Sequence, residues 1–561
     1  MRIDSVFMFF VTAVETFAAI VPSSSLTQHE QEILMEQVRN VYSGNGSSQM
    51  LFHRPEKYSL IDGRVVESNI ELKLYTKTEA ENTLKFLAQK KGDPNFLKYQ
   101  CNWLKRMFPD IHCATDKTDS GWEGMDYQDN VDRLTESWVA SPESSIDELP
   151  VNGQTSISLW SDDYWKLAWG GISYRYGEGV YYGTYNEAVN SYFQPNVWMR
   201  SVETLSVARL EQAIEKWSPA EKYDLIVNNL EFTLTKEQKT EGEGFRDENG
   251  EVEGWMGLCH GWAAAAIMTP KPNASAKLWG PLGTSVKWFP HDVRALTTLA
   301  WANGNYRSNF VGQRCNLKNP TTLSNGRIRD SECFDNNPGT FHLALANLIG
   351  IAKSSFVMDA AFDYQVWNQP VAAYEFTYFN PLNPVKVSKN WAEVAVNYDS
   401  NFKLKDPFQS PLTRGKRLND SGHYDDSQID KVVGVFATVV YLGEVHPIHG
   451  DSAREENFLR VSYSYDLELK SIGDRHEVMG GEWHTNAHPD FLWVPQKGAV
   501  AQTSFDLPNL NFDGNDKPSN VVTQRASQAS SYGYPLCSVI STLLEKSTGT
   551  TTYDCSQEEG Q

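Results

Sequence analysis

The feature that most restricts the fold of this chain is the arrangement of its seven cysteines. Six of them lie in pairs that are close together in the sequence, and the seventh, Cys259, has no near neighbour. Short loops are readily closed by disulfides in an oxidising compartment, so we expect three local bridges and one free thiol. Spacing alone leaves the connectivity open. The expected pairs are Cys101 with Cys113, Cys315 with Cys333, and Cys537 with Cys555.

The N-terminus indicates where the protein works. Arg2 precedes a mostly apolar stretch from Val6 to Val21, and small residues follow it at Ser23–Ser25. This is the pattern of a secretory signal peptide, with a buried core helix as the alternative. We therefore expect residues 1–24 to be a signal peptide and the mature protein to be secreted and extracellular. Elsewhere no run approaches the ~20 apolar residues that a membrane span needs, so we expect none.

Charge and composition exclude two classes of protein. The formal net charge is −21, so the chain would repel a phosphate backbone, and we expect no nucleic-acid partner. Hydrophobic residues make up 40% of the chain and aromatic residues 12%, which is enough apolar surface to bury a core. We therefore expect an ordered globular protein.

The mature chain divides into three regions. Residues 25–150 are expected to be a helical N-terminal region ending in a linker rich in Ser, Pro and acidic residues, at a position that would suit the end of a pro-region. Residues 151–522 show helical patterns first and strand patterns later, which indicates an α+β domain with a largely antiparallel sheet. Residues 523–561 form a polar tail that a disulfide would close.

Two local patterns support this division. Ser218 to Glu221 form a capping box with Pro219 at the first helical position, which predicts a helix start. Further along, alternation of apolar and polar residues predicts a half-buried strand. Its expected inner face consists of Val461, Tyr463, Tyr465, Leu467 and Leu469.

Cys259 is the candidate nucleophile. The Ala-rich run Trp262–Met268 favours a helix, and Gly254 and Gly257 precede it, so Cys259 should lie at or just before the helix N-terminus. There the free N–H groups and the helix dipole favour a thiolate and could serve an oxyanion, as in papain-type enzymes. The alternative is an inert cysteine that packs the helix start. The unpaired count and the Gly-rich entry favour catalysis.

A thiolate nucleophile also needs a base and a group that orients it. His342 lies in an apolar segment that is followed by a short break and a strand ending at Asp359, so adjacent antiparallel elements would bring the two side chains together. The resulting order Cys, His, Asp is that of the papain clan. The alternatives are a core role for His342, His488 as the base, and Asp363 as the carboxylate. His260 adjoins the cysteine, but neighbouring helical residues point apart.

One segment resembles a known family. Six consecutive residues are identical to the start of the surface elicitor motif of the oomycete transglutaminase elicitor family, and the resemblance extends from about Trp160 to Pro495. It implies that 151–522 is a transglutaminase-like, calcium-dependent catalytic domain built around Cys259. It also implies an exposed peptide that a plant surface receptor detects. The six residues are Val366, Trp367, Asn368, Gln369, Pro370 and Val371.

The chain departs from the family pattern directly after the motif. The family continues with Arg-Gly, an aromatic residue and Lys, whereas this chain has Ala372, Ala373, Tyr374 and Glu375. Basic character is lost and an acid appears, which bears on plant recognition. These positions are not expected to take part in catalysis.

Calcium has a local candidate just before the nucleophile. Asp247, Asn249 and Glu251 supply oxygen atoms at alternate positions around a Gly turn, as a hard cation prefers. The segment lacks a complete EF-hand pattern, and the alternative is a solvated acidic loop.

The expected reaction is acyl transfer on protein substrates with accessible Gln and Lys. Cys259 would attack a glutamine carboxamide, ammonia would leave, and a lysine amine or water would take the acyl group from the thioester. Trp165, Trp255 and Trp262 are expected to wall the cleft and exclude water. A cysteine endopeptidase with the same triad and a non-catalytic secreted ligand that displays the motif are the alternative functions.

Overall fold

The computed structural model describes most of the chain from residue 131 onward. The described residues are 56–61, 64–67, 131–178, 181–191, 205–312, 336–360, 365–406, 428–484, 488–507, 510–550, 553 and 555. The signal peptide, the expected N-terminal helices and the Cys101–Cys113 and Cys315–Cys333 pairs lie outside them. Between 25 and 130 the described elements are two strands, β1 (Glu56–Ile61) and β2 (Arg64–Glu67).

The fold is α+β with a large antiparallel sheet, as expected. Twelve strands join it in the order β2-β1-β12-β11-β8-β7-β14-β6, with β3 and β9 on β8, β10 on β11 and β13 on β12. The remaining bounds are β3 (Asn152–Gln154), β6 (Ser308–Gly312), β7 (Val357–Met358), β8 (Gln369–Asn380), β9 (Asn383–Ser388), β10 (Val396–Asn397), β11 (Lys431–Gly443), β12 (Asn457–Ile472), β13 (Arg475–Trp483) and β14 (Phe491–Pro495). A separate hairpin pairs β4 (Ala276–Trp279) with β5 (Ser285–Trp288).

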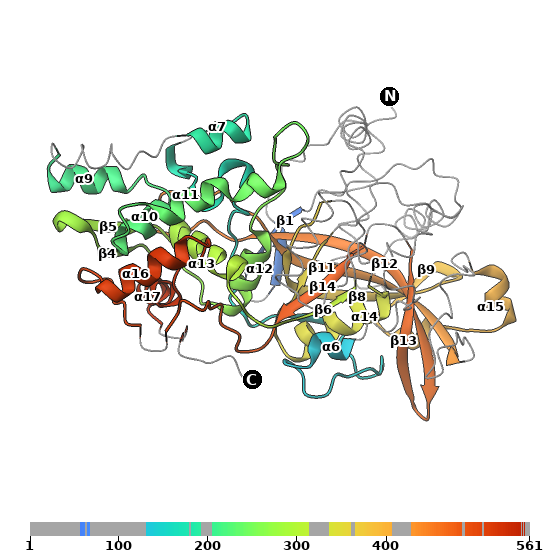
Figure 1. Ribbon diagram of the computed structural model, residues 1–561. Coiled ribbons are helices and arrows are strands. Elements are labelled where there is room, and N and C mark those ends of the chain that lie inside the picture. Colours follow the sequence, from blue (N-terminus) through green and yellow to red (C-terminus); the bar gives the residue numbers. More distant parts are fainter. Residues whose placement is uncertain are drawn as a thin grey trace, which may run out of the picture.

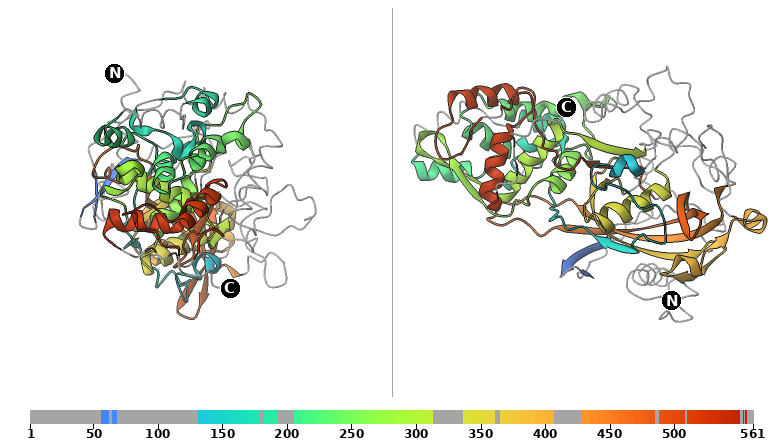
Figure 2. Two further views of the ribbon diagram at one scale, coloured as in Figure 1. Left: turned by 60° about the vertical axis from the view of Figure 1, so that its left-hand side comes forward. Right: turned by 90° about the horizontal axis from the view of Figure 1, so that it is seen from below.

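Most helices gather at the end of the molecule opposite the long strands (Figure 1). The view from below shows the same elongated arrangement, with helices at one end and the long strands at the other (Figure 2, right). The helices there are α7 (Tyr185–Asn190), α9 (Val207–Ile214), α10 (Pro219–Ile226), α11 (Thr233–Thr240), α12 (Cys259–Met268), α13 (Pro290–Asn303), α16 (Asn520–Ser530) and α17 (Cys537–Thr548). On the sheet side lie α6 (Val131–Thr135), α14 (Pro338–Ala344), which continues as a π-helix to Ile351, and α15 (Ser400–Lys405).

Both local sequence patterns are confirmed. The Ser218 hydroxyl accepts from the Glu221 N–H and the Glu221 carboxylate accepts from the Ser218 N–H, which closes the capping box of α10. On β12 the aromatic and leucine side chains of the predicted inner face are buried. Asp466 and Glu468, which alternation places on the other face, are also buried, so this part of β12 is covered on both sides.

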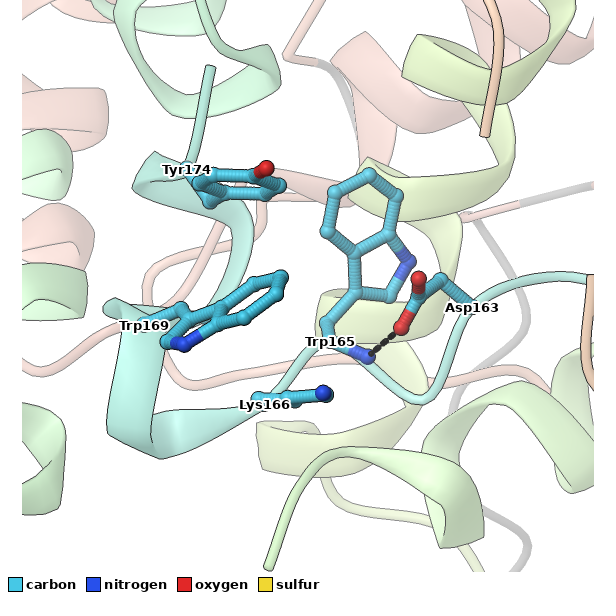
Figure 3. A pocket seen from close by; sticks show the side chains of 6 residues that line it. Asp163, Trp165, Lys166, Trp169 and Tyr174 are labelled. Atoms are coloured by element: carbon cyan, nitrogen blue, oxygen red, sulfur yellow. Dashed lines mark hydrogen bonds between the residues drawn. The ribbon is translucent and has the colours of Figure 1, made fainter. Parts of the chain in front are cut away.

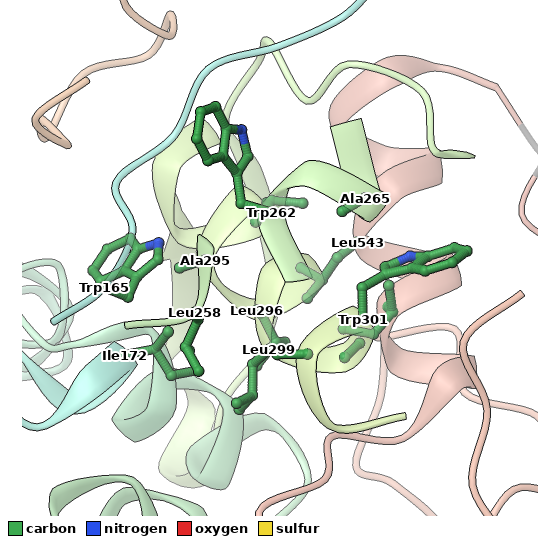
Figure 4. Close-up of a cluster of buried hydrophobic side chains, with 14 of the residues drawn as sticks. Trp165, Ile172, Leu258, Trp262, Ala265, Ala295, Leu296, Leu299, Trp301 and Leu543 are labelled. Carbon is green, nitrogen blue, oxygen red and sulfur yellow. The ribbon is translucent and has the colours of Figure 1, made fainter. Parts of the chain in front are cut away.

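The helical end has its own apolar core (Figure 4). Trp262 on α12 and Trp165 lie inside it with almost no exposed surface, and Trp255 packs against it half-buried. Trp262 is therefore a core residue and not the expected wall of a cleft, whereas Trp165, although buried, also lines a small pocket described below. Gly261 lets α12 approach α13 closely, because a Cβ there would lie 2.3 Å from the carbonyl oxygen of Thr298. Any larger residue at 261 would separate the two helices.

The C-terminal region is part of this core. A disulfide joins Cys537 to Cys555, as predicted. Its helix α17 packs against α13 and its helix α16 against α11, so the polar composition of 523–561 conceals two packed helices. Within the described part of the chain, every helix is too short or too polar to cross a bilayer.

Candidate active site

Cys259 is the first residue of α12, at the junction between the helical end and the sheet. Its thiol is free, and its side chain is 5% exposed. The preceding turn is fixed by an adjacent segment, because the Leu258 N–H donates to the carbonyl oxygen of Tyr164 at 2.6 Å. Gly257 is required there, since a Cβ would lie 2.2 Å from that oxygen. The predicted position at the start of a helix is thus observed.

The sulfur of Cys259 is held by a residue of the elicitor motif. The Asn368 side-chain amide Nδ2 lies 3.3 Å from Sγ, and the Val366 carbonyl oxygen lies 3.8 Å from it. Asn368 Oδ1 accepts from the Trp493 indole N–H at 2.8 Å. An indole nitrogen can only donate, so this contact orients the amide with its NH₂ group toward the sulfur. Asn368 was not among the predicted catalytic groups, although it lies within the recognised motif.

The elicitor motif is built into the fold at the start of β8. Val366 and Trp367 are half-buried, and Asn368 to Val371 are buried. The Val371 N–H donates to Phe356 O at 2.8 Å. The Trp367 ring meets Tyr164 edge-on at 5.2 Å. The resemblance implied that this peptide is exposed, and the structure corrects that expectation. In the folded chain the segment lies against the nucleophile.

Asp359 lies beside the same corner. Its side chain is fully buried, and its Oδ2 accepts from the Trp367 N–H at 3.1 Å, which holds the motif in place. Its charge also contributes to raising the pKa of Cys259. Asp359 was predicted to orient His342, but its carboxylate instead contacts the backbone of the motif.

His342 lies elsewhere. Its ring stacks on Phe376 at 3.9 Å, and its Nδ1 is 2.9 Å from the Tyr465 hydroxyl. Burial lowers its pKa to about 3. Phe376 is eight residues beyond Asn368, so at the usual rise of a strand the two positions are roughly 26 Å apart. The structure thus brings Asp359 but not His342 to Cys259.

The other predicted alternatives also have definite places. His488 stacks on Trp483 at 4.9 Å and is buried. His260 points toward α13, with Nε2 3.3 Å from Ala302 O, and burial lowers its pKa to about 4. Asp363 lies outside the described residues.

The electrostatics at Cys259 differ from the expectation. Burial raises the pKa of the thiol to about 11, opposed by hydrogen bonds from Asn368 and assisted by the charges of Glu444 and Asp359. The predicted lowering by the helix N-terminus is therefore outweighed by burial and two nearby carboxylates. In this state Cys259 is a neutral thiol at pH 7 and needs a proton acceptor to react.

Glu444 is a second carboxylate that sequence reasoning missed. It directly follows β11, and the next N–H, that of Val445, donates to Asp162 O at 3.0 Å. Burial raises the pKa of Glu444 to about 7, and the charge of Asp163 adds to the effect. No local signal marks Glu444, because its position depends on how β11 pairs with β8.

A small open pocket adjoins this corner (Figure 3). Trp169 and Tyr174 form its aromatic sides, with ring centroids 5.1 Å apart. The Lys166 ammonium lies 4.1 Å from the Trp169 centroid and 5.6 Å from the Tyr164 centroid. Asp163 Oδ1 accepts from the Trp165 N–H at 2.9 Å. An ammonium group is thus already accommodated next to the segment that fixes Cys259.

The predicted calcium ligands serve as turn-forming groups. Asp247 Oδ1 accepts the N–H groups of Asn249 at 2.8 Å and Glu251 at 3.0 Å. Glu251 Oε2 accepts from the Tyr185 N–H at 2.8 Å. Across the described ranges, no group of three or more His, Cys, Asp or Glu side chains could hold a metal ion. These three residues therefore do not fit a calcium site in this conformation.

Comparison with known proteins finds a family that matches the part of the chain containing this site. Residues 130–406 match the family described as Transglutaminase elicitor, and this region contains Cys259, Asp359 and Asn368. No curated protein sequence matches the chain. The crystal structure of the GP42 transglutaminase from Phytophthora sojae is similar, with 18% sequence identity and a TM-score of 0.45. The alignment covers 75% of this chain and 98% of that chain.

Proposed function

We propose, from the premise that this chain belongs to the transglutaminase elicitor family, that it is a secreted protein-glutamine γ-glutamyltransferase with Cys259 as its nucleophile. The observation that carries the proposal is the contact between the free Cys259 thiol and Asn368 of the elicitor motif. The segment that identifies the family thus touches the one group in this corner able to form a thioester.

The arrangement suits acyl transfer in a papain-like core. Cys259 begins a helix whose first N–H groups have no carbonyl partner within the helix, and Asn368 supplies a side-chain N–H beside the sulfur. Such donors stabilise the oxyanion that forms when sulfur attacks the carbon of a carboxamide. Departure of ammonia leaves a thioester, which a lysine amine converts to an isopeptide bond or water hydrolyses to glutamate.

Substrates are proteins with accessible Gln and Lys side chains. Since Asp247, Asn249 and Glu251 do not fit a metal ion, no step of the proposal passes through calcium.

Incorporation of a labelled primary amine into a glutamine-rich protein tests the proposal. We expect label in the substrate, release of ammonia and loss of both after alkylation of Cys259. A cysteine endopeptidase would instead produce new N-termini without incorporating the amine. A non-catalytic ligand would do neither, and that function is disfavoured because four of the six motif residues are buried.

A further inference from the structure

We infer that Glu444 is the proton-transfer group of this site, taking the proton of the Cys259 thiol and returning it to the leaving ammonia. The inference rests on the proposed function and assigns a role that the predicted His342 cannot fill from its place in the sheet core.

Backbone pairing brings Glu444 to the nucleophile. On β11, Tyr441 lies opposite Val371 of β8, so the ends of β11 and the start of β8 are neighbours. Asn368, whose amide touches Sγ, directly precedes β8. Glu444 follows one residue after β11, on the side of the sheet where the motif enters.

A second connection fixes Glu444 from the other direction. Val445 N–H donates to the carbonyl oxygen of Asp162. Two residues further, the Tyr164 carbonyl accepts the N–H of Leu258, the residue before Cys259. The carbonyl of Glu444 itself accepts from Asn457 Nδ2 at 2.9 Å. Glu444 and Cys259 are thus attached to the same short segment, one on each side of it.

One oxygen of the Glu444 carboxyl group is left available, although the group also accepts from the N–H of its own residue. Its Oε1 is buried, and among the described residues it has no hydrogen-bond partner. A buried carboxyl oxygen without a partner destabilises the fold, and such costs concentrate at functional sites. Asp359, the other carboxylate near the thiol, is already engaged with the Trp367 N–H.

The proton affinity of Glu444 suits the role. Its pKa of about 7 lies near neutral pH, where a base and its conjugate acid are both populated. The titratable groups around it are Asp163, Tyr164, Tyr441 and Cys259. Proton transfer from sulfur to Glu444 moves the negative charge to the atom that Asn368 faces and neutralises a carboxylate that opposes the thiolate.

The steps balance as follows. The Glu444 carboxylate takes the thiol proton, and sulfur bonds to the carboxamide carbon. The C–N bond breaks as the nitrogen receives the proton from Glu444 and leaves as ammonia. A neutral lysine amine then bonds to the thioester carbon, the C–S bond breaks, and the amine proton passes through Glu444 to the sulfur. Glu444 ends as a carboxylate and Cys259 as a thiol.

The rate of Cys259 alkylation by iodoacetamide tests this role without requiring transferase activity. The full-length protein is compared with Glu444→Gln and with the matched control Glu455→Gln, an exposed glutamate in the loop after β11. Alkylation at Cys259 is followed by mass spectrometry from pH 5 to pH 9. Thermal melting shows whether each variant is folded.

We expect the wild-type rate to rise through a pH near 7 and Glu444→Gln to react at least about tenfold more slowly there, rising only at alkaline pH. Glu455→Gln should retain the wild-type profile. Simple electrostatics predicts the opposite sign, because removing a negative charge lowers the pKa of the thiol. Faster or unchanged alkylation in folded Glu444→Gln would overturn the inference.

The variant His446→Asn tests the alternative that His446, and not Glu444, is the base. His446 is exposed, with Nδ1 3.4 Å from Asp163 Oδ2, and that hydrogen bond raises its pKa. We expect His446→Asn to keep the pH profile; loss of the profile there would transfer the role to His446 and overturn the inference. A Glu444-dependent profile in a protein that incorporates no amine would instead refute the proposed function and leave Glu444 as the base.

Discussion

Strand β8 carries two polar corners that differ in almost every physical respect. At its start, Asn368 faces the Cys259 thiol, and carboxylates of Asp359 and Glu444 lie nearby. Near its middle, His342 is enclosed by Phe376 and Tyr465. At the first corner loops meet the sheet and a thiol lies just below the surface. At the second, burial keeps an imidazole neutral. Burial alone therefore does not mark a reactive group; a carboxylate beside the group does.

Of the changes that test this comparison, replacement of Cys259 should have the largest effect on activity. We expect Cys259→Ser and Cys259→Ala to lower amine incorporation by about a thousandfold or more, because no other free thiol lies among the described residues. The free energy of unfolding should change by only ~1 kcal/mol, since little buried area is lost. Denaturant unfolding provides the control. Substantial activity in a folded Cys259→Ser protein would remove the nucleophile from this corner.

Replacement of Asn368 should have the second-largest effect on activity. Asn368→Ala removes the amide beside Sγ and leaves the Trp493 indole without its acceptor. We expect kcat/KM for amine incorporation to fall by roughly a hundredfold, as for loss of one oxyanion donor. Asn368→Asp keeps the acceptor for Trp493 but places a charge near the sulfur, so it should be at least as inactive. An active Asn368→Asp variant would show that the amide N–H groups are not needed.

His342 should affect stability and its pH dependence more than activity. The His342 pKa of about 3 is below the ordinary histidine value of about 6.5, so the unfolded chain binds the proton more tightly. The stability that depends on neutral His342 is therefore fully present above about pH 6.5 and is lost as the pH falls toward about 3. We expect His342→Leu to flatten unfolding free energy against pH over that range. Activity at neutral pH should stay within about threefold; a loss comparable to that of Cys259→Ala would restore His342 as the base.

Tyr465→Phe should give the smallest effect. It removes only the hydroxyl that contacts His342 Nδ1, so we expect about 1 kcal/mol of destabilisation and unchanged amine incorporation. A double-mutant cycle with His342→Leu would measure the coupling of the pair. Coupling near zero would mean that ring stacking on Phe376, and not this hydrogen bond, fixes the histidine.

Features that depend on residues close together in the sequence could be predicted, and features that depend on distant contacts could not. The start of α12 at Cys259 depends on an alanine run and entry glycines within a few residues, and it was predictable. The capping box at Ser218 is equally local. The role of Asn368 depends on Trp493, 125 residues away, and Glu444 reaches the site only through the register of β11. His342 and Asp359 were joined by spacing alone, and the packing of α14 on the sheet separates them.

The close packing at Gly261 determines which of the segments around the Cys259 thiol can move. α12 lies against α13 with no room for even a methyl group, so the helix that carries Cys259 is mechanically stiff. The sulfur is nevertheless almost covered, and the cover on the opposite side is the short run Val366–Asn368. Admission of a glutamine side chain must therefore displace that run, and its motion joins the steps that can limit turnover.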